Sequence, residues 1–188
     1  MLVLASASPR RQELLRNAGI EFVVHPANVP ENAREGEAPR SFAERMAREK
    51  ALAVSAQRPN DLILGADTVV VADDEILGKP RDVVDAARML RLLSGRKHEV
   101  ITGVCLARPK IRAEDTRSEM TLVVMNTLSD EDIRAYVASG EPMDKAGAYA
   151  IQGMASRWIS RIEGDYFNVV GLPVALVLRM LKEGQGQT

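Results

Sequence analysis

The first residues of the chain bring hydroxyls, arginines and a helix start together. The opening apolar residues predict a short buried strand, and the segment from Pro9 to Leu15 predicts a helix that Ser8 caps. The turn between them carries two hydroxyls and two guanidinium groups, from Ser6, Ser8, Arg10 and Arg11. Such groups beside a helix N-terminus suit a chain of phosphates. The alternative is a capped helix with a solvated basic first turn, but two arginines oppose the helix dipole unless an anion joins them.

A carboxylate inside an apolar segment is the second candidate. Asp67 stands between Leu62–Leu64 and Val69–Ala72, which read as two parts of one strand. Ionisation there is costly unless a metal ion, hydrogen bonds or cations compensate it. The alternative is a structural aspartate at a bulge with its hydrogen bonds satisfied. Glu31, in a proline-flanked loop, is a second acid, for which the alternative is a solvated loop charge.

Two lysines add positive charge. Lys79 stands between Gly78 and Pro80, which fix the backbone on either side of a long cation that could reach a phosphate. Lys50 is expected on the polar side of a helix that opens with capping-box spacing at Ser41 and runs through Val54. The sequence has no Walker-type glycine loop, cysteine cluster or readable Ser-His-Asp arrangement. We therefore expect hydrolysis assisted by a divalent cation, Mg²⁺ or Mn²⁺, held by carboxylates and substrate phosphates.

Composition limits the classes of partner. The 188 residues are 46% hydrophobic and 27% charged, as in a soluble globular protein. A net charge of −1 with 4% aromatic residues argues against nucleic acid as a partner. No apolar run approaches the roughly 20 residues of a membrane span, and the start does not resemble a signal peptide, so we expect no membrane partner and a cytoplasmic location. The single cysteine, Cys105, lies in an apolar run and is expected to be buried.

Strands and helices alternate along the chain, but the central strands resemble an antiparallel pair. We therefore expect an α/β fold with a mixed sheet flanked by helices. Strands are expected at 2–5, 20–24, 62–72, 98–107, 116–127 and 156–162, with a hairpin arm at 76–77. Helices are expected at 9–15, 41–54, 83–94, 129–138 and 172–181.

Short motifs in a fixed order resemble the Maf family of nucleoside triphosphate pyrophosphatases. They are Ala5–Arg11, Ala47–Ala51, Gly65–Val70, Gly78–Pro80, Asp144–Tyr149, Ile151–Gly153 and Val169–Pro173, and they span almost the whole chain. The resemblance implies an elongated fold of the inosine-triphosphate-pyrophosphatase type, in which a twisted mixed sheet forms the floor of a cleft between two lobes. It also implies a single Maf-like domain of two lobes over residues 1–183. The tail at 184–188 is expected to fray because it is a chain end. A homodimer is compatible with the family.

The family's reaction converts a nucleoside triphosphate and water to the monophosphate and pyrophosphate. Carried over by motif, Asp67 is the catalytic carboxylate, which either activates the attacking water or holds the metal. The phosphate and metal site would be lined by Ser6, Ser8, Arg11, Glu31, Lys50 and Lys79, with Asp67 and Glu31 as metal ligands. The loop reads Val29-Pro30-Glu31 where the family commonly has Val-Asp-Glu, so the middle acid is missing.

Base preference in the family follows the residues that stand here as Arg10, Thr68 and Gln152. This combination is similar to the branch that acts on dTTP and UTP, whereas the 7-methyl-GTP branch tends to have tryptophan, glutamine and glutamate. A glutamine amide both donates to and accepts from a pyrimidine edge. The alternative function is a non-enzymatic nucleotide-sensing or nucleic-acid-binding regulator of cell division and septum formation. Near-neutral charge and few aromatic residues weigh against nucleic-acid binding.

Overall fold

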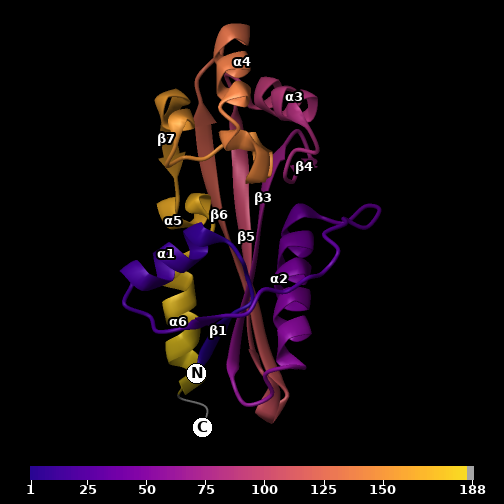
Figure 1. Ribbon diagram of the computed structural model, residues 1–188, viewed down its shortest axis with the longest axis vertical. Coiled ribbons are helices and arrows are strands. Elements are labelled where there is room, and N and C mark those ends of the chain that lie inside the picture. Colours follow the sequence, from indigo (N-terminus) through magenta and orange to yellow (C-terminus); the bar gives the residue numbers. More distant parts are fainter. Residues whose placement is uncertain (186–188) are drawn as a thin grey trace. The chain divides into compact units, whose positions relative to one another are not determined.

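A mixed seven-stranded sheet forms the framework of the computed structural model, which describes residues 1–185 (Figure 1). The strands are β1 (Leu2–Leu4), β2 (Val23–Val24), β3 (Leu62–Ala72), β4 (Glu75–Leu77), β5 (Lys97–Arg108), β6 (Ala113–Met125) and β7 (Ile159–Glu163). Their order is β2-β1-β3-β5-β6-β7, and β4 pairs with β3. Strand β1 pairs in parallel with β2 and β3, whereas β3/β4 and β6/β7 are antiparallel. The predicted mixed α/β sheet is therefore confirmed.

The helices begin largely where side-chain caps predict. They are α1 (Pro9–Asn17), α2 (Pro39–Ser55), α3 (Val83–Leu93), α4 (Asp130–Ala138), α5 (Tyr166–Val170) and α6 (Val174–Gln185). Ser8, Asp82 and Ser129 cap α1, α3 and α4 through their side chains. None of the helices within residues 1–185 has the length and apolar character needed to cross a bilayer.

Helices α2 and α6 depart from the predicted bounds, and α5 was not predicted. Helix α2 begins at Pro39, and its N-cap Ala38 makes no side-chain hydrogen bond, so the predicted capping box at Ser41 is wrong. Proline at the first helical position has already set the helical φ angle two residues earlier. Helix α6 continues to Gln185, into the segment predicted to fray, and residues 186–188 lie outside the described part of the chain.

The chain divides into two compact units. The first unit contains residues 1–68, 102–119 and the segment from 171 onward, and the second contains 69–101 and 120–170. In the first unit, a cluster that includes Val3, Ala47, Ile63 and Cys105 is buried between α2 and the sheet. Burial raises the pKa of the Cys105 thiol to about 11, which agrees with the prediction of a buried, unreactive cysteine.

The second unit has its own hydrophobic core. Helices α3 and α4 pack together, and Leu90, Leu93 and Trp158 belong to the buried cluster. Tyr136 of α4 meets the Trp158 ring edge-to-face at a centroid distance of 5.4 Å. Each unit therefore has a packed interior that can hold functional side chains in place.

Candidate functional site

The first unit brings α2 close to the sheet because two strand glycines leave room for it. A Cβ atom at Gly65 of β3 would lie 2.1 Å from the Ala47 carbonyl oxygen, and one at Gly103 of β5 would lie 2.2 Å from the Ala43 carbonyl oxygen. This close contact buries Lys50, which follows on the next turn of α2. The prediction that Lys50 lies on the polar side of its helix is therefore wrong, because helical spacing does not show that a buried carboxylate of β3 pairs with it.

Lys50 holds two carboxylates together. Its Nζ lies 2.6 Å from Asp67 Oδ1 and 2.6 Å from Glu31 Oε1. Asp67 is 7% exposed, whereas the Glu31 side chain is 43% exposed, so one acid is buried and the other reaches solvent. Burial raises the pKa of Asp67, and the charges of Lys50 and Arg11 offset only part of that effect. A buried carboxylate with a raised pKa beside cations is typical of functional sites.

Arg11 is buried in the same unit and uses most of its donors within the protein. Its Nη1 donates to Ser6 Oγ at 3.1 Å and to the Ala66 carbonyl oxygen at 2.9 Å. Its Nη2 donates to Thr68 Oγ1 at 3.0 Å, and its Nε donates to the Gly171 carbonyl oxygen at 2.8 Å. These bonds occupy four of the five guanidinium N–H groups. Arg11 therefore joins α1, β3 and the segment before α6, and burial lowers its pKa.

The serines at the β1–α1 turn form a local network. Ser8 Oγ accepts from the Arg11 backbone N–H at 3.5 Å, which confirms the predicted cap. The Ser8 backbone N–H donates to Ser6 Oγ at 3.2 Å. Arg10 is half-buried on the first turn of α1. The cap is thus present, but the buried Arg11 contradicts the alternative of a solvated basic first turn. Phosphate binding by the same residues stays a prediction.

Thr68 belongs to the Arg11 network. Besides the bond from Arg11, its Oγ1 lies 2.9 Å from Thr102 Oγ1 and donates to the Gly171 carbonyl oxygen at 3.3 Å. Thr102 is fully buried. Thr68 follows Asp67 in the chain, and its hydroxyl is held in a hydrogen-bond network inside the protein. Its predicted part in base preference stays a prediction.

The loop that carries Glu31 is fastened to α2 by residues that the sequence analysis did not single out. Arg45 donates to both carboxylate oxygens of Glu37 at 2.6 Å and to the Asn32 carbonyl oxygen at 3.0 Å. The hydrogen bonds from Arg45 lower the pKa of Glu37 to about 2. Sequence could have indicated this anchor only through opposite charges eight residues apart, a spacing without structural meaning until the loop folds back.

Lys79 and Gln152 belong to the second unit, and both side chains are exposed. Lys79 lies between β4 and α3, where the Gly147 backbone N–H donates to the Gly78 carbonyl oxygen at 3.0 Å. Gly147 has a positive φ of 67°, and a Cβ there would come 2.9 Å from Val70. A glycine is thus required at position 147, where the segment 144–149 contacts Val70 and Gly78. Phosphate binding by Lys79 and base recognition by Gln152 stay predictions.

The acids around Lys50 are suitable donors for a hard cation. Within residues 1–185 no group of three or more His, Cys, Asp or Glu side chains is arranged to hold a metal ion. Asp67 and Glu31 nevertheless present two carboxylates to one positive charge. Mg²⁺ is usually bound by one or two carboxylates together with water and substrate phosphates. The two residues therefore fit a cation that arrives with its substrate.

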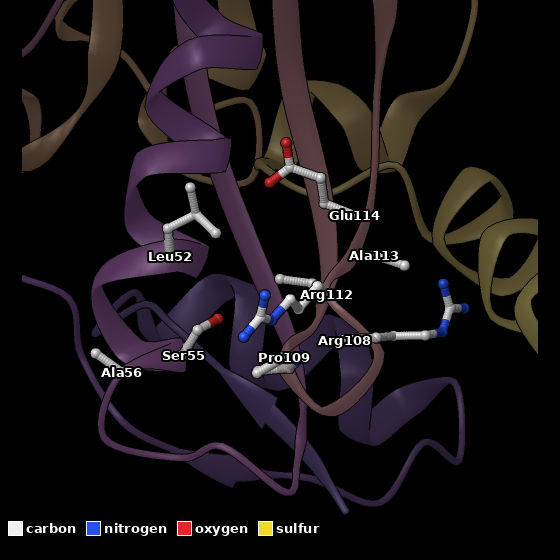
Figure 2. Close-up of a pocket in the computed structure, with 9 residues that line it drawn as sticks. Leu52, Ser55, Ala56, Arg108, Pro109, Arg112, Ala113 and Glu114 are labelled. Atoms are coloured by element: carbon white, nitrogen blue, oxygen red, sulfur yellow. The ribbon is translucent and has the colours of Figure 1, made fainter.

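A separate pocket of about 350 Å³ lies in the first unit (Figure 2). Residues of α2, including Leu52 and Ser55, line one side, and the turn that includes Arg108 and Arg112 lines the other. In Figure 2 the Arg112 side chain reaches toward Ser55, whereas that of Arg108 points away. None of the predicted site residues lines this pocket, so it is distinct from the cluster around Lys50.

The whole chain is similar to one protein family. The family model described as "Maf-like protein" matches residues 1–184. A protein of Koribacter versatilis named dTTP/UTP pyrophosphatase is 60% identical over 96% of this chain and 93% of its own length. Relatives with the same name from Syntrophomonas wolfei and Geobacter sulfurreducens are each 53% identical, over 95% and 96% of this chain and 94% and 95% of their own lengths. The chain therefore belongs to the family of Maf-like proteins.

Proposed function

We propose that this protein hydrolyses dTTP and UTP to the corresponding monophosphate and pyrophosphate. Support comes from the shared name of its relatives, which match nearly their full length. The observation that carries the proposal is the pair of carboxylates, Asp67 and Glu31, on the single ammonium group of Lys50. A buried acid with a raised pKa, beside positive charge, is suited to hydrolysis of a polyphosphate.

In the proposed reaction, water attacks the α-phosphorus and pyrophosphate leaves. Asp67 either accepts a proton from that water or holds the cation. Its raised pKa makes it a stronger base than an ordinary aspartate. Lys50 keeps Asp67 and Glu31 in place and lies where it can neutralise phosphate charge. Positioning and charge neutralisation dominate such phosphoryl-transfer reactions.

A divalent cation, Mg²⁺ or Mn²⁺, is part of the proposal, and Asp67 and Glu31 are the residues that would hold it. The chemistry it supplies is neutralisation of phosphate charge and a lower pKa for coordinated water. The bonds of Arg11 refine its expected role. With four of its N–H groups engaged within the protein, Arg11 supports Ser6 and Thr68 and contributes its positive charge toward the phosphates.

Recognition of the nucleotide is assigned to residues at both ends of the substrate. We propose Ser6, Ser8 and Lys79 as further phosphate-binding residues and Arg10, Thr68 and Gln152 as determinants of pyrimidine preference. The Gln152 amide can both donate to and accept from a pyrimidine edge. The proposal includes a cytoplasmic location, because nucleoside triphosphates are the substrates, and a homodimer, which light scattering on the purified protein would test.

Identification of the products tests the function. The protein is incubated in H₂¹⁸O with dTTP, UTP or 7-methyl-GTP, with Mg²⁺ or Mn²⁺, and the products are separated and weighed by mass spectrometry. We expect dTMP and UMP that carry the ¹⁸O label, unlabelled pyrophosphate and slow turnover of 7-methyl-GTP. Orthophosphate with dTDP would contradict attack at the α-phosphorus. DNA binding without any turnover would contradict enzymatic function.

A further inference from the structure

The loop that presents Gln152 is a tight turn in the second unit. The Gly153 backbone N–H donates to the Ala150 carbonyl oxygen at 3.1 Å, so Gln152 occupies a central position of the turn. Its side chain is exposed and has several rotatable bonds. A flexible amide can discriminate between bases only if the backbone that carries it is fixed, because ordering it on binding costs affinity.

Both ends of this turn are bound by one pair of side chains. The Ala150 backbone N–H donates to Tyr136 Oη at 3.1 Å. The Met154 backbone N–H donates to Glu141 Oε1 at 3.1 Å and to Oε2 at 3.3 Å. Tyr136 Oη donates in turn to Glu141 Oε1 at 2.8 Å. One continuous set of hydrogen bonds therefore runs from one end of the turn to the other.

The pair itself is rigid. Tyr136 is fully buried on α4, and its ring packs against Trp158. Glu141 begins the 3₁₀ helix η2 (Glu141–Asp144), and Lys145 Nζ donates to its backbone carbonyl oxygen at 2.7 Å. Its carboxylate also occupies the space beside Gly153, where an added Cβ would lie 2.0 Å from Oε1.

The constraint at Gly153 is one of space and not of backbone conformation. Its φ is −102°, which other residues adopt readily. Any side chain at this position would collide with the Glu141 carboxylate. The turn is therefore fixed by two hydrogen-bonded ends and by one close contact next to Gln152 itself.

We propose that Tyr136 and Glu141 are positioning residues that fix the turn carrying Gln152 and thereby set the base preference. The inference rests on the proposed function, in which Gln152 meets the base. A purely structural role, in which the pair only satisfies two backbone N–H groups, predicts lower stability without a change in preference. The two roles therefore differ in a measurable quantity, the ratio of kcat/KM for dTTP to kcat/KM for 7-methyl-GTP.

The first experiment removes one hydroxyl. Tyr136→Phe keeps the ring against Trp158 but loses the acceptor for Ala150 and the donor to Glu141. Of the two lost bonds, only the one from Ala150 holds the turn directly, so we expect the selectivity ratio to fall about five- to tenfold, mainly through a higher KM for dTTP. Gly153→Ala, which separates the Glu141 carboxylate from the turn, is expected to lower the ratio in the same direction. An unchanged ratio in both variants would overturn the inference.

A double-mutant cycle tests whether the pair acts through Gln152. Gln152→Ala is combined with Tyr136→Phe, and selectivity is measured for the wild type, both single variants and the double variant. If Tyr136 acts by positioning Gln152, its substitution has no further effect on selectivity once Gln152 is alanine. Additive losses would overturn the inference.

Tyr149→Phe is the matched control. It removes another buried hydroxyl of the same core, one that is bonded to His98 Nε2 at 2.8 Å. We expect a lower melting temperature and an unchanged selectivity ratio. An equal loss of selectivity in Tyr149→Phe would mean that any loosening of this core has the effect, and would overturn the inference. Absence of wild-type turnover would instead overturn the proposed function.

Discussion

The two compact units each bury an aspartate against basic side chains, but the pKa values of these aspartates move in opposite directions. Asp67 of the first unit is 7% exposed and Asp85 of the second is 6% exposed. Burial raises the pKa of Asp67. Hydrogen bonds, foremost from Arg81, lower the pKa of Asp85 to about 2. Equal burial therefore says little about function. The two pKa shifts differ because neighbouring groups compensate the charge of Asp85 better than that of Asp67.

Asp85 is fully compensated. It accepts from the backbone N–H and Nε of Arg81 and from Nε of Arg88, and the arginine side chains are 83% and 46% exposed. Asp67 instead shares the buried Lys50 with Glu31. The first arrangement stabilises a helix start, whereas the second leaves an acid poised to take a cation or a proton.

Removal of Lys50 should disrupt the site around Asp67 most strongly. Lys50→Met leaves Asp67 and Glu31 without their shared cation, so we expect dTTP turnover to fall by at least about 100-fold. The matched control is Arg88→Met, which takes a partner from Asp85 and should lower stability while turnover persists. Release of pyrophosphate measures both. Near-parental turnover by Lys50→Met would show that the cluster is structural.

Arg11→Lys should damage the same unit through its geometry. A lysine keeps the charge but cannot supply the four directed N–H groups that bind Ser6, Ala66, Thr68 and Gly171. We expect the free energy of unfolding to fall by about 2–4 kcal/mol, because buried acceptors lose their donors. Urea denaturation measures it. A loss below the error of the method would contradict the bracing role of Arg11.

Arg45→Lys should loosen the loop that carries Glu31. The bidentate contact with Glu37 and the bond to Asn32 would be lost, but no group of the Lys50 cluster changes. We expect the Mg²⁺ concentration for half-maximal turnover to rise about tenfold, as for substitutions behind a metal ligand. Titration with Mg²⁺ at saturating dTTP measures it. An unchanged midpoint would separate Glu31 from cation binding.

The two aspartates should have opposite effects on the pH dependence of stability in metal-free protein. Since the pKa of Asp85 is depressed to about 2, its bonds stabilise the fold above its ordinary pKa of 3.8, and this stability is lost as the pH falls toward 2. Asp85→Asn should therefore lower stability at neutral pH by about 1 kcal/mol and flatten the acid limb.

For Asp67 the sign is reversed. Its pKa is raised on folding, so its ionisation costs stability once the pH exceeds the unfolded-state value. Asp67→Asn removes this cost, so the melting temperature of the variant at neutral pH should be no lower than its melting temperature at pH 4. Thermal unfolding in EDTA between pH 2 and 8 measures both variants. The same trend in both would remove the distinction between the two units.

Local patterns predicted most of the fold. Capping residues marked the starts of α1, α3 and α4, and apolar runs marked β3 and β5. Prediction failed at two helices. Residues 166–170 form α5 without periodic apolar spacing, and a proline rather than the Ser41 pattern starts α2.

The site was predictable from residue types in part only. Asp67 stood out because a charge inside an apolar strand needs compensation. The burial of Lys50 depends on Gly65 and Gly103, whose contacts with α2 join segments distant in sequence. Arg45 acts through Glu37 across a folded loop, and the Tyr136–Glu141 pair acts through backbone N–H groups, and sequence patterns reveal neither contact.

Turnover of Asp67→Asn, compared with Asp85→Asn, tests the central claim most directly. Both substitutions remove one buried negative charge and keep the side-chain shape. The rate of dTMP formation from dTTP with Mg²⁺ is measured beside thermal unfolding of each protein. We expect Asp67→Asn to be folded and inactive, and Asp85→Asn to be less stable and active. Parental turnover by folded Asp67→Asn would contradict the assignment of this acid to the reaction.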